Sequence, residues 1–276
     1  MASERARRGQ PLRASGRQAK QLAAPAVSLR SLSKSFEDKR AVDGLSLDVP
    51  TGSFFGLVGP NGAGKSTTLK MATGLLRPDA GSVEVCDHDV WSDPVAAKAR
   101  IGVLTEDLRL FDRLSADELL SYNGLLRGMD PATTRTRADE LLDVLGLADD
   151  RATFVIDYSQ GMRKKIALAC ALLHAPRVVF LDEPFESVDP ISSRTIRNVL
   201  ERYTETGGTV VFSSHVMETV ERICDHIGVI SSGRLVASGP TNELLGGKRL
   251  EDVFFELVGA APDDTSALAW LDTSSP

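Results

Sequence analysis

The chain has 276 residues, of which 42% are hydrophobic and 25% are charged, and its net charge is −6. This composition is typical of a globular protein with enough apolar residues for a core, in one large or two small domains. Residues 1–30 carry seven basic side chains and one acidic side chain, Glu4, which leaves a net charge of −12 for the remainder. Since nucleic acid binds to basic surfaces, this acidic body predicts no nucleic-acid partner.

The cysteines and the apolar runs indicate the redox environment of the protein and its relation to a membrane. Cys86, Cys170 and Cys224 are far apart and show no Cys-x-x-Cys spacing, which indicates reduced thiols in a cytosolic protein. The longest apolar run, residues 166–173, is much shorter than the roughly 18 residues that span a bilayer. We therefore expect any membrane role to depend on a partner chain.

Both ends of the chain are predicted to be disordered. Residues 1–25 form a basic extension that is rich in Arg, Ala and Ser and lacks apolar periodicity. An organelle transit peptide is the alternative interpretation of this Arg-rich, acid-poor start. Residues 260–276 combine small residues with three aspartates and predict a second disordered tail.

The first part of the chain reads as strands around one helix. Apolar alternation or short apolar runs predict strands over residues 27–32, 45–49, 54–58, 82–85 and 101–104. A helix is expected over residues 64–76, ended by Arg77 and Pro78.

The middle of the chain is helical, and alternation of strands and helices then returns. Ser115 and Glu118 have the spacing of a capping box that opens a helix, and residues 138–145 have helical spacing up to Gly146. Strands are predicted over residues 178–181, 209–212 and 227–230, with helices over residues 191–203 and 215–223. This alternation predicts a parallel sheet with helices on its faces.

A phosphate-binding loop follows the predicted strand 54–58. The pattern Gly-x-x-x-x-Gly-Lys-Ser is satisfied between that strand and a helix. Its glycines let backbone N–H groups turn toward phosphate oxygens, and the helix N-terminus adds partial positive charge. We expect ATP to be held by Gly59, Pro60, Asn61, Gly62, Ala63, Gly64, Lys65, Ser66 and Thr67. Lys65 should reach the β- and γ-phosphates, and the Ser66 hydroxyl should ligate Mg²⁺. A glycine-rich turn with an incidental lysine is the alternative, which the flanking elements disfavour.

Two carboxylates end the predicted strand 178–181. Asp182 would lie beside Mg²⁺, and Glu183 would accept the proton of the attacking water. Ordinary surface acids at a strand end are the alternative, which becomes weak beside a phosphate-binding loop.

Further motifs resemble one family of ATPases. The run Tyr158-Ser159-Gln160-Gly161-Met162 resembles the Leu-Ser-Gly-Gly-Gln signature of ABC transporter ATPases, with matches at Ser159 and Gly161. Asp189 falls on the position of the family's D-loop aspartate, His215 on that of its switch histidine, and Phe36 on that of the aromatic residue that stacks on adenine. The resemblance covers about residues 26–245.

The resemblance implies the fold and the division of the chain. The expected fold is α/β, a P-loop NTPase core with an N-terminal antiparallel β subdomain and an inserted α-helical subdomain. The core would comprise residues 26–106 and 174–245, and the helical signature subdomain residues 107–173. A C-terminal helix is expected over residues 246–259, since residues 250–258 resemble the ending of export-type subunits.

The resemblance also implies a working cycle. Two such subunits, a homodimer or a heterodimer with a second ABC ATPase subunit, would close head to tail around two ATP molecules. Each ATP would lie between the phosphate loop of one subunit and Ser159 and Gly161 of the other, with Asp189 at this interface. Glu183, His215 and Lys65 would be catalytic. Hydrolysis would drive an integral membrane permease, which places the chain in the cytoplasm on the inner face of the cell membrane.

The residues carried over from the resemblance each have a simpler interpretation. Phe36 could be a core aromatic, His215 could cap the helix that begins there, and Ser159 could be only a helix N-cap. The basic residues 163–165 are expected to form a solvated face near the dimer interface.

Glu106 departs from the family pattern, which has Gln at this position. A carboxylate can still ligate Mg²⁺, and we hypothesise that Glu106 is a metal-linked coupling residue. An exposed loop acid is the alternative. Leu108, Leu110 and Phe111 follow it, either as contacts to the permease or as part of the subdomain core.

The leading interpretation is therefore the ATPase subunit of an exporter whose permease is a separate chain. A soluble ABC-type ATPase with a regulatory or translation-associated role is the alternative, although such chains generally carry two cassettes or a long coiled-coil insertion. A non-hydrolysing module is the third class, and the presence of Glu183 argues against it.

Overall fold

The computed structural model describes residues 24–259. The disordered segments predicted for residues 1–25 and 260–276 therefore lie outside the described residues, apart from residues 24 and 25.

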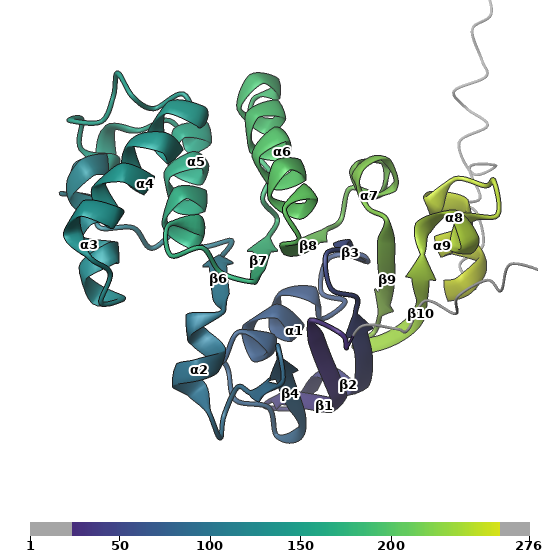
Figure 1. The fold of residues 1–276 in the computed structure, drawn as a ribbon. Coiled ribbons are helices and arrows are strands. Elements are labelled where there is room, and N and C mark those ends of the chain that lie inside the picture. Colours follow the sequence, from purple (N-terminus) through teal and green to yellow (C-terminus); the bar gives the residue numbers. More distant parts are fainter. Residues whose placement is uncertain (1–23, 260–276) are drawn as a thin grey trace, which may run out of the picture.

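A six-stranded sheet forms the centre of the molecule, with the strand order β10-β9-β3-β8-β7-β6 (Figure 1). Its strands are β3 (Phe54–Val58), β6 (Ile101–Leu104), β7 (Val178–Asp182), β8 (Thr209–Ser214), β9 (His226–Ser231) and β10 (Arg234–Pro240). Strand β10 is antiparallel to β9, and the other neighbouring strands are parallel. Parallel strands covered on both faces are apolar throughout, which explains the uninterrupted apolar runs of β3 and β7.

The register of the parallel strands brings their carboxyl ends to one edge. Val58 at the end of β3 pairs with Ser214, and Asp182 at the end of β7 pairs with Ser213. Strand β6 pairs with β7 up to Leu104. The loops that follow these four strands therefore leave the sheet side by side.

A second sheet is antiparallel, with the order β2-β1-β4-β5. It contains β1 (Val27–Phe36), β2 (Lys39–Val49), β4 (Ala80–Val85) and β5 (His88–Asp89). The first strand is longer than predicted, because its pairing with β2 continues to the partners Phe36 and Lys39. Figure 1 shows this sheet below the central one, beside α1 (Lys65–Ala72) and α2 (Pro94–Ala99).

Helices α3 (Ala116–Leu126), α4 (Pro131–Val144) and α5 (Gln160–Leu172) form a separate group at the upper left of Figure 1. A short 3-10 helix, Val155–Asp157, precedes α5. Ser115 caps α3 in the predicted capping box with Glu118. The remaining helices are α6 (Pro190–Glu205), α7 (Met217–Ile223), α8 (Thr241–Leu245) and α9 (Leu250–Val258).

The core lies on both faces of the central sheet. Phe54 and Val58 of β3 belong to one apolar cluster, which includes residues of α3 to α7 and α9. Phe55 and Leu57 of the same strand belong to another, which includes residues of β1, β2 and α1. Alternate residues of one strand therefore hold the two layers together.

Three helix predictions were wrong at their ends. The C-terminal helix predicted over residues 246–259 begins at Leu250, because Gly246 and Gly247 have left-handed φ angles of 53° and 87°. The helix predicted for residues 64–76 ends at Ala72, because Gly74 takes a left-handed φ of 70° and the Leu75 and Leu76 amides both turn back to the Lys70 carbonyl. The helix predicted from residue 215 begins at Met217, because the Val216 amide donates to the Ser214 side chain in a turn.

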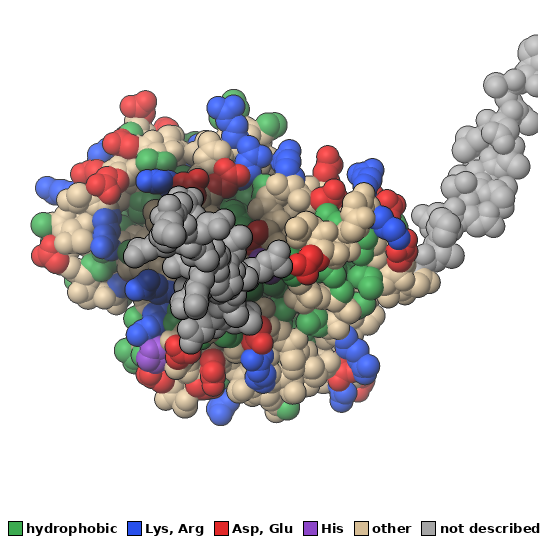
Figure 2. All heavy atoms as spheres, turned by 45° about the vertical axis from the view of Figure 1, so that its right-hand side comes forward, with side chains coloured by type: hydrophobic (Ala, Val, Ile, Leu, Met, Phe, Trp, Pro, Cys, Tyr) green, Lys and Arg blue, Asp and Glu red, His purple; other side chains and the backbone are tan. Residues whose placement is uncertain are grey.

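The architecture is the predicted one, an α/β core with an antiparallel β layer and an inserted helical group. In the part of the chain that is described, every helix is too short or too polar to span a bilayer. On the face shown in Figure 2, acidic and basic side chains are interspersed with apolar ones.

Candidate functional site

A cavity of about 440 Å³ opens where the loops leave the carboxyl edge of the central sheet. Its walls come from the phosphate loop, from the end of the β1–β2 hairpin and from the loops after β6, β7 and β8. The lining residues are Phe36, Lys39, Ala41, Asn61, Gly62, Ala63, Gly64, Lys65, Ser66, Thr67, Glu106, Glu183, Glu186 and His215.

The glycines of the loop are required by its shape. Gly62 and Gly64 have φ angles of 77° and 106°, in the region that side-chain-bearing residues rarely adopt. A Cβ on Gly59 would lie 2.2 Å from the Ile230 carbonyl oxygen. The backbone can therefore curl beneath the cavity and turn its N–H groups toward it.

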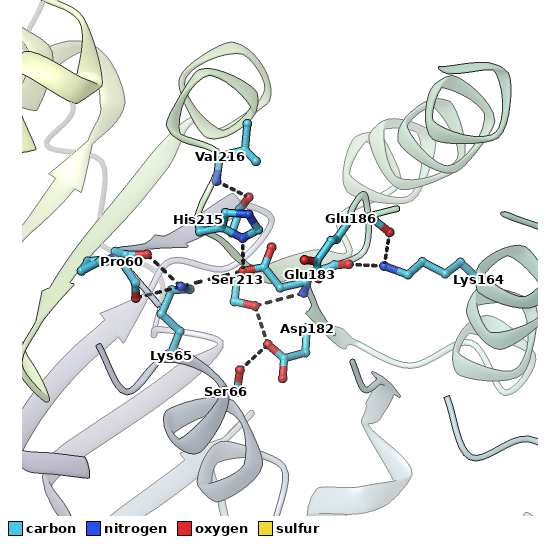
Figure 3. A network of polar contacts seen from close by, with 12 residues as sticks. Pro60, Lys65, Ser66, Lys164, Asp182, Glu183, Glu186, Ser213, His215 and Val216 are labelled. Atoms are coloured by element: carbon cyan, nitrogen blue, oxygen red, sulfur yellow. Dashed lines mark hydrogen bonds and ion pairs between the residues drawn. The ribbon is translucent and has the colours of Figure 1, made fainter. Parts of the chain in front are cut away.

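Lys65 lies at the floor of the cavity with only 6% of its side chain exposed. Its Nζ donates to the carbonyls of Gly59 at 2.8 Å and Pro60 at 3.2 Å, and lies 3.8 Å from Glu183 Oε1 (Figure 3). Burial lowers the pKa of Lys65, and the charges of Glu183 and Asp182 oppose that effect. An ammonium group is thus held beside the space in which the phosphates are expected.

Asp182 joins the phosphate loop to strand β8. Its Oδ1 accepts from Ser66 Oγ at 3.0 Å and from Ser213 Oγ at 2.5 Å. The Ser213 hydroxyl also accepts from the Glu183 amide at 3.1 Å, so one buried serine supports both acids (Figure 3).

Glu183 points toward the cavity and contacts His215. The His215 Nδ1 lies 3.0 Å from Glu183 Oε1, and since a carboxylate only accepts, this nitrogen donates. Glu183 has a φ of 47°, a left-handed conformation that is unfavourable for a residue with a side chain. The interpretation of His215 as a helix cap is wrong, because Val216 is the N-cap of α7.

Glu106 lies in the exposed loop after β6 and lines the same cavity. Partial burial raises the pKa of its carboxyl group, and the nearby carboxylates of Asp182 and Glu186 raise it further. The site therefore holds more negative charge than a glutamine at this position would give.

Phe36 ends strand β1 at the rim of the cavity, with 48% of its surface exposed. The Lys34 Nζ lies 5.8 Å from its ring centre. The interpretation of Phe36 as a core aromatic is wrong, and its ring is free to stack on a planar group.

Comparison with known proteins places this geometry in one family. A model of the ABC transporter family matches residues 42–186. The chain is 39% identical to the daunorubicin/doxorubicin resistance ATP-binding protein DrrA of Streptomyces peucetius. The aligned region of 219 residues covers 79% of this chain and 66% of that protein. It is 36% identical to the Nod factor export ATP-binding protein I of Ralstonia nicotianae (strain ATCC BAA-1114 / GMI1000). Here the aligned region of 251 residues covers 90% of this chain and 76% of that protein.

The chain belongs to the ABC transporter ATP-binding family. A solved structure of an ATP-binding subunit of an ABC transporter resembles it with a TM-score of 0.79 at 26% identity, over 84% of this chain and 99% of that one. The predicted fold class and the predicted family are both confirmed. ATP is the ligand of this family, and ATP hydrolysis is its activity.

The signature residues of this ABC protein lie apart from its own cavity. Ser159 and Gly161 do not line the cavity, and neither does Asp189. Ser159 is the N-cap of α5 and accepts from the Met162 amide at 3.3 Å, while Asp189 caps α6. A Cβ on Gly161 would lie 2.8 Å from Asp189 Oδ2, so the signature helix and the start of α6 meet at these two residues.

The basic run after the signature does not form the predicted solvated face. Lys164 and Lys165 are buried, with 3% and 8% of their surfaces exposed. Arg163 is partly buried and pairs with Asp112 at 2.9 Å. The buried residues of α5 begin at Gly161, and Lys164 is buried because it donates to the loop that follows β7.

Sequence reasoning missed Ser213 and Lys164 as parts of the polar network, and Lys39 and Glu186 as cavity residues. Ser213 lies opposite Asp182 only through the parallel register of β7 and β8, which the local sequence does not reveal. Nothing in the local sequence of Lys164 distinguishes it from its neighbours.

The apolar residues that follow Glu106 lie partly in the core and partly on the surface. Leu108 and Leu110 pack partly against the apolar core, which favours their role in the subdomain itself. Phe111 is 54% exposed and meets Tyr122 of α3 edge to face, with ring centres 5.2 Å apart.

Proposed function

We propose that this chain is the ATP-hydrolysing subunit of an ABC exporter and works as a dimer with a separate membrane permease. The supporting observation is the convergence of Lys65, Glu183 and His215, from three separate segments of the chain, around one cavity. Asp182 lies behind the lining and accepts a hydrogen bond from Ser66, which does line the cavity. The family membership supports the same proposal.

In the proposed reaction, the loop N–H groups and Lys65 hold the β- and γ-phosphates of ATP. Glu183 faces the γ-phosphate end of the cavity, where its carboxylate accepts the proton of the attacking water. His215 donates through Nδ1 to that carboxylate, which fixes the direction of the Glu183 side chain.

The residues at the P-loop serine fit Mg²⁺. Ser66 and Asp182 place two hard oxygen atoms 3.0 Å apart, and Mg²⁺ favours one or two protein oxygens together with phosphate and water. Among residues 24–259 no cluster of three or more His, Cys, Asp or Glu side chains forms a metal site, so phosphate would have to complete the ligand set. Mg²⁺ would neutralise charge on the phosphates, and Glu106, which lines the same cavity as Ser66, could extend this set.

A head-to-tail dimer accounts for the position of the signature motif. Ser159 and Gly161 lie at the start of α5, outside the chain's own cavity. A second subunit would bring its own signature to this cavity, where the helix N-terminus and the serine hydroxyl suit a γ-phosphate. Asp189 beside Gly161 would lie at the same interface.

Export through a permease is supported by the surface and by the relatives. Phe111 and Tyr122 expose aromatic surface beside the loop that carries Glu106, where a permease helix would contact the subunit. The two relatives are named for drug resistance and Nod factor export. This function places the chain in the cytoplasm on the inner face of the cell membrane.

Glu183→Gln tests the proposal. A general base contributes about 10²- to 10⁴-fold, so ATP hydrolysis should fall at least a hundredfold while ATP-dependent dimerisation persists in size-exclusion chromatography. Glu218→Gln, an exposed acid in the first turn of α7, is the matched control. A Glu183→Gln variant at the wild-type rate would show that Glu183 is not the base, and a wild type that hydrolyses no ATP even with its permease would refute the function.

A further inference from the structure

A buried lysine connects the signature helix to the catalytic loop. The Lys164 Nζ donates to the Glu183 carbonyl at 2.5 Å and to the Glu186 carbonyl at 2.8 Å (Figure 3). Lys164 lies five residues after Ser159 on α5 and is only 3% exposed. In the described part of the chain, no other side chain of the helical group, residues 107–173, donates a hydrogen bond to the loop of residues 183–189.

The loop that receives these bonds is a strained turn. Glu183 has a φ of 47° and Ser187 a φ of 56°, although neither is glycine. The Glu186 amide donates to the Glu183 carbonyl at 3.3 Å and closes the turn. This brings the Glu183 and Glu186 carbonyls together, and one ammonium group satisfies both of them.

The charges around Lys164 favour the same arrangement. Burial lowers the pKa of Lys164, and the carboxylates of Glu186 and Glu183 oppose this effect. Lys164 approaches the turn from α5, whereas Lys65 approaches Glu183 from the phosphate loop. A neutral side chain would not replace its charge, and a glutamine amide, although it has two donors, is shorter than the lysine side chain.

We infer that Lys164 is a positioning residue that fixes the backbone turn of the catalytic Glu183 and ties this turn to the signature helix. The inference rests on the proposed function. In the proposed dimer, the signature of one subunit touches the ATP of its partner, while Glu183 of that subunit acts on its own ATP. Lys164 would therefore connect the two composite sites within one chain, because movement of α5 displaces the Glu183 carbonyl.

The test replaces Lys164 by Met, by Arg and by Gln and measures steady-state ATP hydrolysis with nucleotide binding. Displacement of a catalytic group by about 1 Å can cost about a hundredfold in rate. Lys164→Met should lower kcat about 10- to 100-fold, with KM for ATP within about twofold, since the phosphate loop is untouched. Lys164→Arg retains a charged double donor and should recover most of kcat. If Lys164→Met does not fold, Lys164→Gln replaces it in the test, because its side chain is shorter and neutral and should lower kcat in the same way.

Lys165→Met is the matched control, because Lys165 is the next buried lysine of α5 and makes no hydrogen bond to the turn among the described residues. Its kcat should stay within about twofold of the wild type. Amide exchange over residues 183–187 supplies a second readout, and the Glu186 amide should exchange faster in Lys164→Met than in Lys165→Met.

The outcomes separate this inference from the proposed function. If the wild type hydrolyses ATP and Lys164→Met does so with an unchanged kcat, the inference is wrong while the proposed function stands. An equal loss in Lys165→Met, or no recovery in Lys164→Arg, also overturns it. A wild type without any hydrolysis refutes the proposed function first.

Discussion

Ser213→Ala removes the hydroxyl through which strand β8 supports both acids of the site. Ser213 is 0% exposed, donates to Asp182 Oδ1 at 2.5 Å and accepts from the Glu183 amide at 3.1 Å. The alanine would leave a buried amide without this acceptor and a carboxylate with one donor fewer.

The magnitude follows from these two bonds. A hydrogen bond to a charged group contributes about 1.5–3 kcal/mol, and a buried group left unsatisfied costs about 1–3 kcal/mol. Because the two effects share one atom and are not additive, we expect a loss of about 3 kcal/mol in the free energy of unfolding. For a chain of this size, that lowers Tm by about 6–12 °C.

Thermal unfolding without nucleotide measures this effect, followed by urea unfolding to obtain the free energy. Ser214→Ala is the control, because Ser214 is also buried but its side chain, among residues 24–259, accepts only the Val216 amide of the next turn. It should cost about 1 kcal/mol. Ser213→Ala with a Tm within about 1 °C of the wild type, or no lower than that of Ser214→Ala, would refute the argument.

Three further predictions concern the ligand, the metal and pH. Phe36→Ala should weaken ATP binding about tenfold through loss of stacking, with recovery in Phe36→Trp, and an unchanged Kd would remove Phe36 from the site. Glu106→Gln, which removes a carboxylate from an acidic cavity, should shift the Mg²⁺ concentration for half-maximal ATPase several-fold, and an unchanged profile would leave Glu106 as a loop acid. Burial, helped by Arg127, lowers the pKa of His174 from 6.5 to about 4, so its neutral ring stabilises the fold above pH 6.5 and this contribution is lost as the pH falls toward 4. His174→Gln should flatten the pH dependence of urea unfolding by about 1 kcal/mol between pH 6.5 and 5.5, and parallel curves would contradict the assignment.

The sequence determined the parts of this protein that depend on local chemistry. The phosphate loop follows from its glycines, whose left-handed φ angles at Gly62 and Gly64 few other residues adopt. The parallel strands of the central sheet follow from their apolar runs, whereas the antiparallel strand β10 has no such run and was not predicted. The start of α3 follows from the capping box of Ser115. Each of these signals is complete within a few neighbouring residues, so no knowledge of the fold is needed to find it.

Helix ends were less predictable, because side chains elsewhere decide them. The helix predicted from residue 215 starts two residues later, where His215 turns to Glu183 and Ser214 accepts the Val216 amide. The apolar spacing of residues 215–223 gives no sign of a partner 32 positions earlier in the chain.

Only the tertiary structure decided which polar groups meet. It placed Ser213 between Asp182 and Glu183, buried Lys164 under the catalytic turn, and separated Ser159 and Gly161 from the cavity of their own chain. A serine or a lysine has the same sequence context whether water or a buried carbonyl is its partner. The register of parallel strands and the packing of α5 select that partner, and both arise from contacts between segments far apart in the chain.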